Sequence, residues 1–293
     1  MIKMRKNLSF FVVLLLSLLP AYGVTAQDIV ATPVPGTVPV GVLAEFDIDE
    51  LPGPHTEVWF MRFQLEPEGL LPVGTSPGPQ VLYVEVGTIV VKAEGTVIPS
   101  DTVAVDTSEF TLKPGDSLLV PRDVPVEVSN TADEPARFLV LLMYGGMDED
   151  QVQAGSEEPV GLTSAGITVG VAEFMPVPAT LTMERVVVEP GETMQNIDLE
   201  NLGPGPGWMG MDLGTVETGS ADLLFEKQSI DTIIWPAASP DSFPEPDRVR
   251  FTANGSVEQG ESYAVYGSVV TFTNTGDEPL TILRVIVTPH MGE

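Results

Sequence analysis

Histidine and cysteine, the side chains that most often bind transition metals or act as nucleophiles and bases, are almost absent from this sequence. It has no cysteine and two histidines: His55 follows a Pro-Gly-Pro turn sequence, and His290 lies three residues before the end. A transition-metal site needs three or four ligands that converge on one point, and Ser–His catalysis needs a histidine beside the serine. We therefore expect both histidines to be exposed imidazoles rather than ligands or catalytic bases.

Carboxylates are abundant, with 42 Asp and Glu against 13 Lys and Arg, for a formal net charge of −29. They are scattered and not grouped at the spacing of Ca²⁺ ligands, which predicts a solvated acidic surface. This charge argues against nucleic acid and anionic membranes as partners, because both attract Lys and Arg.

The N-terminal segment has the pattern of a secretory signal peptide. Basic residues at positions 3–6 precede an apolar run over 8–19, and small residues follow at 24–26. The run is shorter than the about 20 residues that a membrane-spanning helix needs. We predict a signal peptide over 1–26, a secreted protein that is not inserted in the membrane, and a Pro-rich tether over 27–39.

The rest of the chain contains one sequence pattern twice. The matching segments are 40–46 with 169–174, Arg62 and Glu66 with Arg185 and Glu189, 85–88 with 212–215, and 130–135 with 274–279. The matches keep their order and are a domain length apart, which indicates a tandem duplication. We predict one domain over 40–144 and a second over 167–293, joined by an acidic linker over 145–166.

Both copies have the sequence character of β-structure. Apolar and polar residues alternate over 59–65 and 124–129, and the chain contains 28 Gly and 27 Pro. Many short alternating segments separated by Gly and Pro turns predict an all-β sandwich or barrel.

Residues 115–130 resemble the second conserved motif of the cupin superfamily. Gly115, Pro121 and Asn130 match its glycine, proline and asparagine, whereas Val126 replaces the metal-binding histidine. The second copy repeats the motif over 260–274, with Val270 near the histidine position. The resemblance implies two tandem cupin-like barrels, of the double-stranded β-helix or jelly-roll type.

The first cupin motif places a metal-binding glutamate seven residues before a glycine. Counting back from Gly87 gives Gln80, and counting back from Gly214 gives Gly207. No histidine lies near the His-x-His position of this motif in either copy. We take Gln80, Val126, Gly207 and Val270 as the family's ligand positions, expect no cofactor, and expect apolar barrel interiors that are either packed or shaped for an apolar ligand.

Three further residues deserve a structural prediction. Glu85 and Asp212 occupy matching places in the repeat just before a glycine, so we predict solvated structural carboxylates. Trp235 borders a Pro-rich loop, 236–247, that is found only in the second copy. It is our candidate for a surface contact.

Three hypotheses for the function remain open. The first is a non-catalytic extracytoplasmic bicupin that binds a small molecule or a surface component without a metal. The second is a metal-dependent cupin enzyme, of the oxalate or dioxygenase kind, that uses carboxylate ligands such as Glu66, Glu68 or Glu192. The third is a structural envelope protein in which the loop 236–247 contacts a partner.

Overall fold

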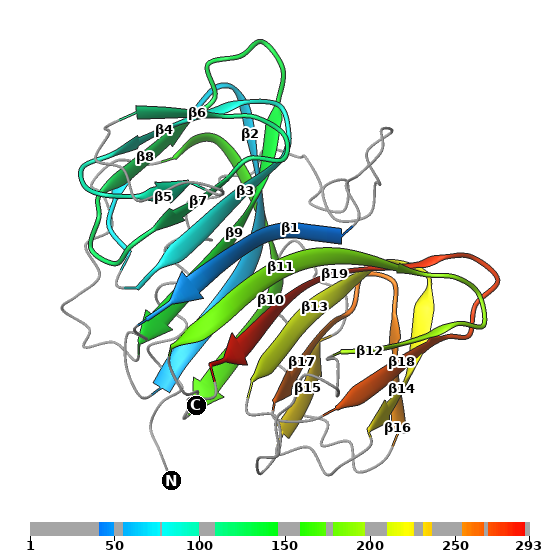
Figure 1. The fold of residues 1–293 in the computed structure, drawn as a ribbon. Coiled ribbons are helices and arrows are strands. Elements are labelled where there is room, and N and C mark those ends of the chain that lie inside the picture. Colours follow the sequence, from blue (N-terminus) through cyan, green and yellow to red (C-terminus); the bar gives the residue numbers. More distant parts are fainter. Residues whose placement is uncertain are drawn as a thin grey trace, which may run out of the picture.

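The computed structural model describes ten stretches of the chain. They are residues 41–49, 55–76, 78–99, 109–145, 159–173, 178–196, 210–225, 231–235, 254–266 and 269–290. The predicted signal peptide, the tether and the loop 236–247 lie outside them. The regular elements of these stretches are strands, as the sequence predicts (Figure 1). No helix in the described stretches is long and apolar enough to cross a membrane.

The first half forms a curled nine-stranded sheet. Its strands run β5-β7-β3-β9-β2-β8-β4-β6, and β10 pairs with β2. The bounds are β2 His55–Gly74, β3 Gln80–Val86, β4 Ile89–Ala93, β5 Ile98–Pro99, β6 Glu109–Leu112, β7 Ser117–Val120, β8 Val126–Ser129, β9 Ala136–Gly145 and β10 Val160–Glu173.

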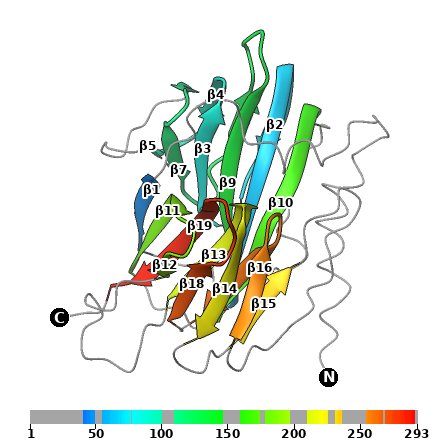
Figure 2. The ribbon, with the colours of Figure 1, turned by 90° about the vertical axis from the view of Figure 1, so that its right-hand side faces the viewer.

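The second half forms a six-stranded sheet, β1-β11-β19-β13-β17-β15, and a four-stranded sheet, β12-β18-β14-β16. The bounds are β1 Gly41–Ile48, β11 Ala179–Val188, β12 Thr193–Gln195, β13 Met211–Thr218, β14 Ser220–Phe225, β15 Asp231–Trp235, β16 Asn254–Glu258, β17 Ser262–Tyr266, β18 Val270–Asn274 and β19 Leu280–Pro289. The two halves are tandem barrels of the cupin-like, jelly-roll type. Figure 2 shows the first half, with β3 and β4, above the second, with β14 and β16.

The two halves exchange strands: the strand that precedes the first half in the sequence joins the second half, and the strand that precedes the second half joins the first. Strand β1 pairs antiparallel with β11 of the second half, and β10 pairs antiparallel with β2 of the first half. Part of the predicted linker, residues 160–166, is therefore strand. Because backbone hydrogen bonds cross in both directions, the halves cannot separate without breaking two strand pairings.

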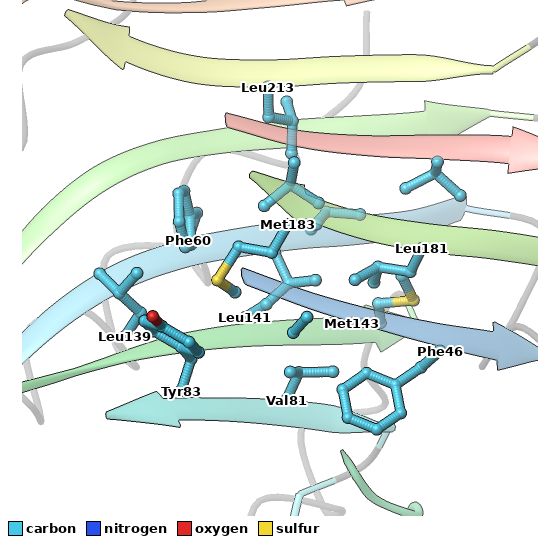
Figure 3. Packing of buried hydrophobic residues seen from close by; sticks show 14 of the residues in the cluster. Phe46, Phe60, Val81, Tyr83, Leu139, Leu141, Met143, Leu181, Met183 and Leu213 are labelled. Carbon is cyan, nitrogen blue, oxygen red and sulfur yellow. The ribbon is translucent and has the colours of Figure 1, made fainter. Parts of the chain in front are cut away.

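Apolar side chains form a core between the halves in addition to one inside each barrel. The central core joins Phe46 of β1 and Phe60 of β2 to Met183, Leu213 and other residues of the second half (Figure 3). Alternation explains the arrangement. In β2, Phe60 faces this central core, whereas its neighbour Met61 packs against the interior of the first barrel.

The asparagine turns of the two copies match as the sequence predicts. Asn130 Nδ2 donates to the carbonyl oxygens of Leu65 and Glu134. Asn274 Nδ2 donates to those of Val188 and Glu278. The same side chain therefore ties the same turn to the same neighbouring strand in each barrel.

The sequence-based alignment of 85–88 with 212–215 is wrong, because the strand register shifts the matching segment of the second copy by five residues. Strand β3 has a register shift between Val84 and Val86, and β13 has the same shift between Val216 and Thr218. These shifts make Glu85 and Glu217 equivalent, because each carboxylate sits at the bulge.

The glycines that follow support this register. Gly87 and Gly219 both have positive φ, 77° and 80°. A Cβ on Gly87 would lie 2.7 Å from the Cα of Ala136, and one on Gly219 would lie 3.0 Å from the Cα of Leu280. Gly214, in contrast, lies inside β13. Glu85-Val86-Gly87 and Asp212-Leu213-Gly214 share an acid-x-Gly pattern, but they are not at equivalent positions of the two barrels.

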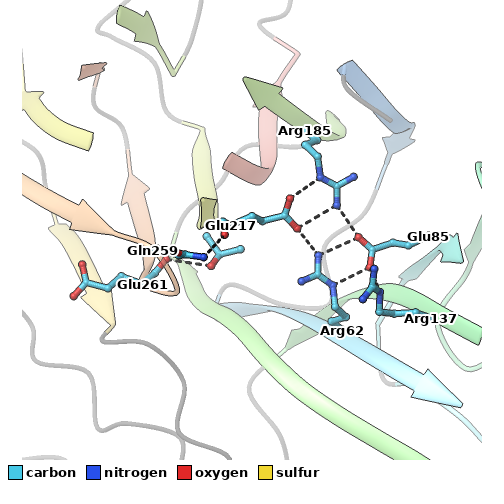
Figure 4. Close-up of polar contacts among 8 residues, drawn as sticks. Arg62, Glu85, Arg137, Arg185, Glu217, Gln259 and Glu261 are labelled. Atoms are coloured by element: carbon cyan, nitrogen blue, oxygen red, sulfur yellow. Dashed lines mark hydrogen bonds and ion pairs between the residues drawn. The ribbon is translucent and has the colours of Figure 1, made fainter. Parts of the chain in front are cut away.

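With this register, four charged residues form a ring between the barrels. Arg62 Nε lies 2.8 Å from Glu85 Oε2, and Arg185 Nε lies 2.6 Å from Glu217 Oε2. Two further contacts cross between the halves, Arg62 Nη2 to Glu217 Oε1 at 2.5 Å and Arg185 Nη2 to Glu85 Oε1 at 2.7 Å (Figure 4). The ring has approximate twofold symmetry, since the duplication relates Arg62 to Arg185 and Glu85 to Glu217.

Arg62, Glu85 and Arg185 are buried and Glu217 is partly buried, so the expectation that Glu85 is solvated is wrong. Burial by itself would lower the pKa of Arg62, but the carboxylates of Glu85 and Glu217 raise it above its ordinary value. Burial would raise the pKa of Glu217, but Arg185 and Arg62 hold it below its ordinary value. The charges are therefore stable only together.

Replacing Glu85 with Gln removes the carboxylate that faces Arg62 and Arg185 and leaves their buried charges undercompensated. Loss of one partner from a buried ion pair typically destabilises a protein by about 3–5 kcal/mol, so we expect a loss of this order in urea unfolding. Lys92→Gln is the control, because Lys92 is 53% exposed in its pair with Glu127, and exposed ion pairs contribute little to stability, so we expect a far smaller loss. Equal losses in the two variants would contradict the structural role of the ring.

Candidate functional site

The two valines at the family's histidine positions lie in packed barrel interiors. Val126 begins β8 within the core of the first barrel, and Val270 begins β18 within that of the second. Both are buried among other apolar side chains. These positions present hydrocarbon and have no atom that could bind a metal or donate a hydrogen bond.

The position of the family's glutamate differs between the barrels. Gln80 begins β3, is partly buried, and pairs with Leu142 and Val120 on its two sides. The residue with equivalent pairings in the second barrel is Asp212, seven residues before Gly219. The strand register thus selects Asp212 rather than Gly207, which lies outside the described residues.

Trp235 ends β15, at the edge of the six-stranded sheet. The orientation of its side chain lies outside what the structure describes. Its suggested surface contact stays a prediction.

Asp212 belongs to a buried polar cluster, so the expectation that its carboxylate is solvated is wrong. Asp212 is 0% exposed to solvent. The Tyr263 hydroxyl donates to Asp212 Oδ1 at 3.2 Å, and Arg284 Nη1 lies 3.4 Å from Asp212 Oδ2. Arg284 Nε donates to Glu184 Oε1 at 2.6 Å, and its Nη1 also donates to the carbonyl oxygen of Asn196 at 3.2 Å. Glu184 and Asp212 are therefore held on two sides of one guanidinium.

Strand pairing shows where this cluster comes from. One row of paired residues crosses four strands of each barrel. The row is Met61, Val140, Leu82 and Leu118 in the first barrel, and Glu184, Arg284, Gly214 and Tyr263 in the second. The first row packs in or against an apolar core. Both barrels contain the expected apolar core, but in the second barrel this row is charged and hydroxyl-bearing.

Gly214 and Tyr263 are complementary in volume. The first barrel pairs Leu82 with Leu118 at this point of the row. In the second, a Cβ on Gly214 would lie 2.5 Å from the Tyr263 hydroxyl oxygen. The missing side chain makes room for the phenol ring, which can then reach Asp212. Sequence reasoning missed this pair, although a glycine within an alternating strand is a known sign of close approach.

Burial favours a proton on Asp212. Burial is the largest influence and raises the pKa of Asp212 from its ordinary 3.8 to about 6, although Arg284 and the Tyr263 hydroxyl partly oppose the shift. Burial and the Asp212 carboxylate raise the pKa of Tyr263 well above its ordinary value, so the phenol stays protonated. The site can therefore exchange one proton at mildly acidic pH.

The carboxylates proposed as metal ligands do not come together. Glu66 accepts a hydrogen bond from Gln64 Nε2 at 2.8 Å, whereas Glu68 and Glu192 are exposed. Within the described stretches, no group of three or more His, Cys, Asp or Glu residues is arranged to hold a metal ion. His290 is exposed, as expected, and its Nε2 lies 3.5 Å from Asp47 Oδ1.

Comparison with known proteins agrees with this architecture. Residues 61–142 match the Cupin domain family. The first barrel, to which these residues belong, is therefore a Cupin domain. No curated protein sequence matches it significantly.

Solved structures similar to this chain include seed and bacterial proteins. The coconut allergen cocosin has a TM-score of 0.46 and 13% identity, covering 79% of this chain and 77% of cocosin. Procruciferin, the 11S globulin of Brassica napus, has a TM-score of 0.43 and 10% identity, with coverage of 79% and 77%. A Bacillus subtilis oxalate decarboxylase variant has a TM-score of 0.46 and 11% identity, with coverage of 92% and 82%.

The raised pKa of Asp212 predicts a pH-dependent stability. Protonated Asp212 favours the folded state, so its stabilising contribution is complete below pH 3.8 and is lost as pH rises through about 6. The shift corresponds to roughly 3 kcal/mol. We expect the unfolding free energy of the wild type, measured relative to Asp212→Asn, to fall by about this amount between pH 3.5 and pH 7.

Urea unfolding of both proteins across this pH range provides the measurement. Taking the difference between the two proteins removes the titration of the other carboxylates. A difference that is constant with pH, or that increases with pH, would contradict the raised pKa.

Proposed function

We propose that this cupin is a non-catalytic, exported binding protein that holds a small polar molecule in its second barrel without a metal. One observation carries the proposal. A row of positions that is apolar in the first barrel carries Glu184, Arg284 and Tyr263 in the second, beside Asp212.

The polar cluster around Asp212 is not required for the stability of the fold. Burying charged groups is expensive even when they are paired, and apolar replacements of similar volume are often as stable or more stable. The first barrel is an internal control, because it closes the same strands with Met61, Leu82, Leu118 and Val140. Stability alone therefore does not explain the polar row, and ligand recognition does.

The chemistry of the cluster suggests the kind of ligand. Asp212 can accept a hydrogen bond, or donate one when protonated, and its pKa of about 6 makes both forms accessible. Tyr263 supplies a hydroxyl, and Arg284 supplies a guanidinium that binds Glu184 closely and makes a long contact with Asp212. These groups suit a compact ligand that both donates and accepts hydrogen bonds.

The two barrels would then have different tasks. The first barrel supports the second through the exchanged strands, the shared core and the Arg–Glu ring. The signal-peptide pattern, with basic residues at 3–6 and an apolar run over 8–19, supports the proposal that the protein is exported.

The test is a thermal-shift screen of small polar molecules, followed by calorimetric titration of those that stabilise the protein. A ligand present at 100 times its Kd stabilises the folded state by about 2.7 kcal/mol, which is readily measured. We expect any such ligand to stabilise the wild type and to lose its effect in Asp212→Asn.

Gln80→Glu is the matched control, because it makes the reverse exchange of amide and carboxylate at the equivalent position of the first barrel. It should leave ligand binding intact. Binding that survives Asp212→Asn but is lost in Gln80→Glu would place the site in the first barrel and contradict the proposal. Elemental analysis of protein purified without chelators is the second measurement, and a stoichiometric transition metal would overturn the metal-free part of the proposal.

A further inference from the structure

A third arginine stands beside the Arg–Glu ring and is not needed to complete it. The ring itself contains two arginines and two glutamates, so its formal charges cancel. Arg137 of β9 adds one positive charge at its rim, on the side of Glu85 (Figure 4).

Arg137 is only partly engaged by its neighbours. Its Nε donates to Glu85 Oε2 at 3.1 Å. Among the residues that the structure describes, Glu85 is its single ion-pair partner, and the same carboxylate already accepts from Arg62 and Arg185. The Arg137 side chain is 15% exposed. Its two terminal nitrogens therefore lie at a rim that solvent can reach, with no carboxylate of their own in the described part of the chain.

The duplication shows that the ring does not require this arginine. In the first half, Arg137 pairs with Val86 directly after the bulge. In the second half, the residue that pairs with Thr218 directly after the equivalent bulge is Thr281. Threonine at this point is compatible with the Arg185–Glu217 pair, so Arg137 breaks the symmetry of the ring by adding charge.

The electrostatic surroundings agree with this excess of positive charge. Burial lowers the pKa of Arg137, the Arg62 guanidinium lowers it further, and Glu85 only partly offsets both. Gln64, opposite Arg137 in the strand register, has its amide directed to Glu66. Among the described side chains of β2, no acid forms an ion pair with Arg137.

We propose that Arg137 is an anion-binding position, which takes a small oxyanion at the junction of the two barrels. Its two terminal nitrogens form a planar fork whose N–H groups can point at two oxygens of one ligand. Carboxylates and phosphates share that pair of oxygens. Because the whole chain has a net charge of −29, the anion is held by this short-range contact and not by long-range attraction.

This position is separate from the cluster around Asp212. Arg137, on β9 of the first barrel, contacts Glu85 of the ring, whereas Asp212 is buried with Tyr263 and Arg284 in the second barrel. The failure of one proposal therefore leaves the other standing.

The experiment is a titration of the full chain with acetate and with inorganic phosphate, followed by thermal shift and calorimetry. Sodium chloride keeps the ionic strength constant, so that screening of the net charge does not change. We expect saturable binding with a stoichiometry of one in the wild type. Saturation by acetate alone identifies a carboxylate site, and saturation by phosphate alone identifies a phosphate site.

Two variants test the residue. Arg137→Thr installs the residue that the second half already has, and we expect it to abolish the saturable binding. Arg137→Lys keeps the charge but loses the fork, and we expect the affinity to fall by about tenfold. It also provides a reading if the threonine variant folds poorly.

Arg122→Thr is the control, since Arg122 is 51% exposed and pairs only with Asp123 in the described residues. It should bind as the wild type does. Absence of saturable binding in the wild type, or equal affinity in the wild type, Arg137→Thr and Arg137→Lys, would overturn the proposal.

Discussion

The arrangement of this protein depends on the ring that Arg62, Glu85, Arg185 and Glu217 form between the two barrels. Each arginine pairs with the glutamate of its own half and with that of the other. Buried charges are tolerated only when their partners are held in good geometry. The strands exchanged between the halves and the apolar core around them provide that geometry, because they fix the position of one barrel against the other.

The duplication lets each barrel serve as a reference for the other. At the junction the copies are nearly symmetric, except that the residue equivalent to Arg137 in the second half is Thr281. In the interiors they are not, since the row that is hydrocarbon in the first barrel is largely polar in the second. A difference between two copies of one scaffold identifies residues that the scaffold itself does not require. Both functional proposals rest on such differences, one inside the second barrel and one at the junction.

A carboxylate, a phenol and a guanidinium lie together in the second barrel. Valines occupy the histidine positions of both barrels, so the described interiors offer no imidazole. Asp212 keeps a carboxylate at the position of the family's glutamate, but its partners are a phenol and a guanidinium. Such a site is suited to recognising a ligand rather than to activating one through a metal.

The sequence by itself determined the fold class, the duplication and the replacement of histidine at the positions of the cupin motif, because these depend on composition, alternation and the spacing of glycine, proline and asparagine. It could not determine the register between the copies, since Glu85-Val86-Gly87 resembles Asp212-Leu213-Gly214 locally although the bulge in the strand makes Glu217 its equivalent. The tertiary structure alone decided that Asp212 is buried, that Gly214 makes room for Tyr263, and that two arginines share two glutamates across the junction. Each of these facts depends on contacts between residues that are far apart in the chain, which local sequence patterns do not record.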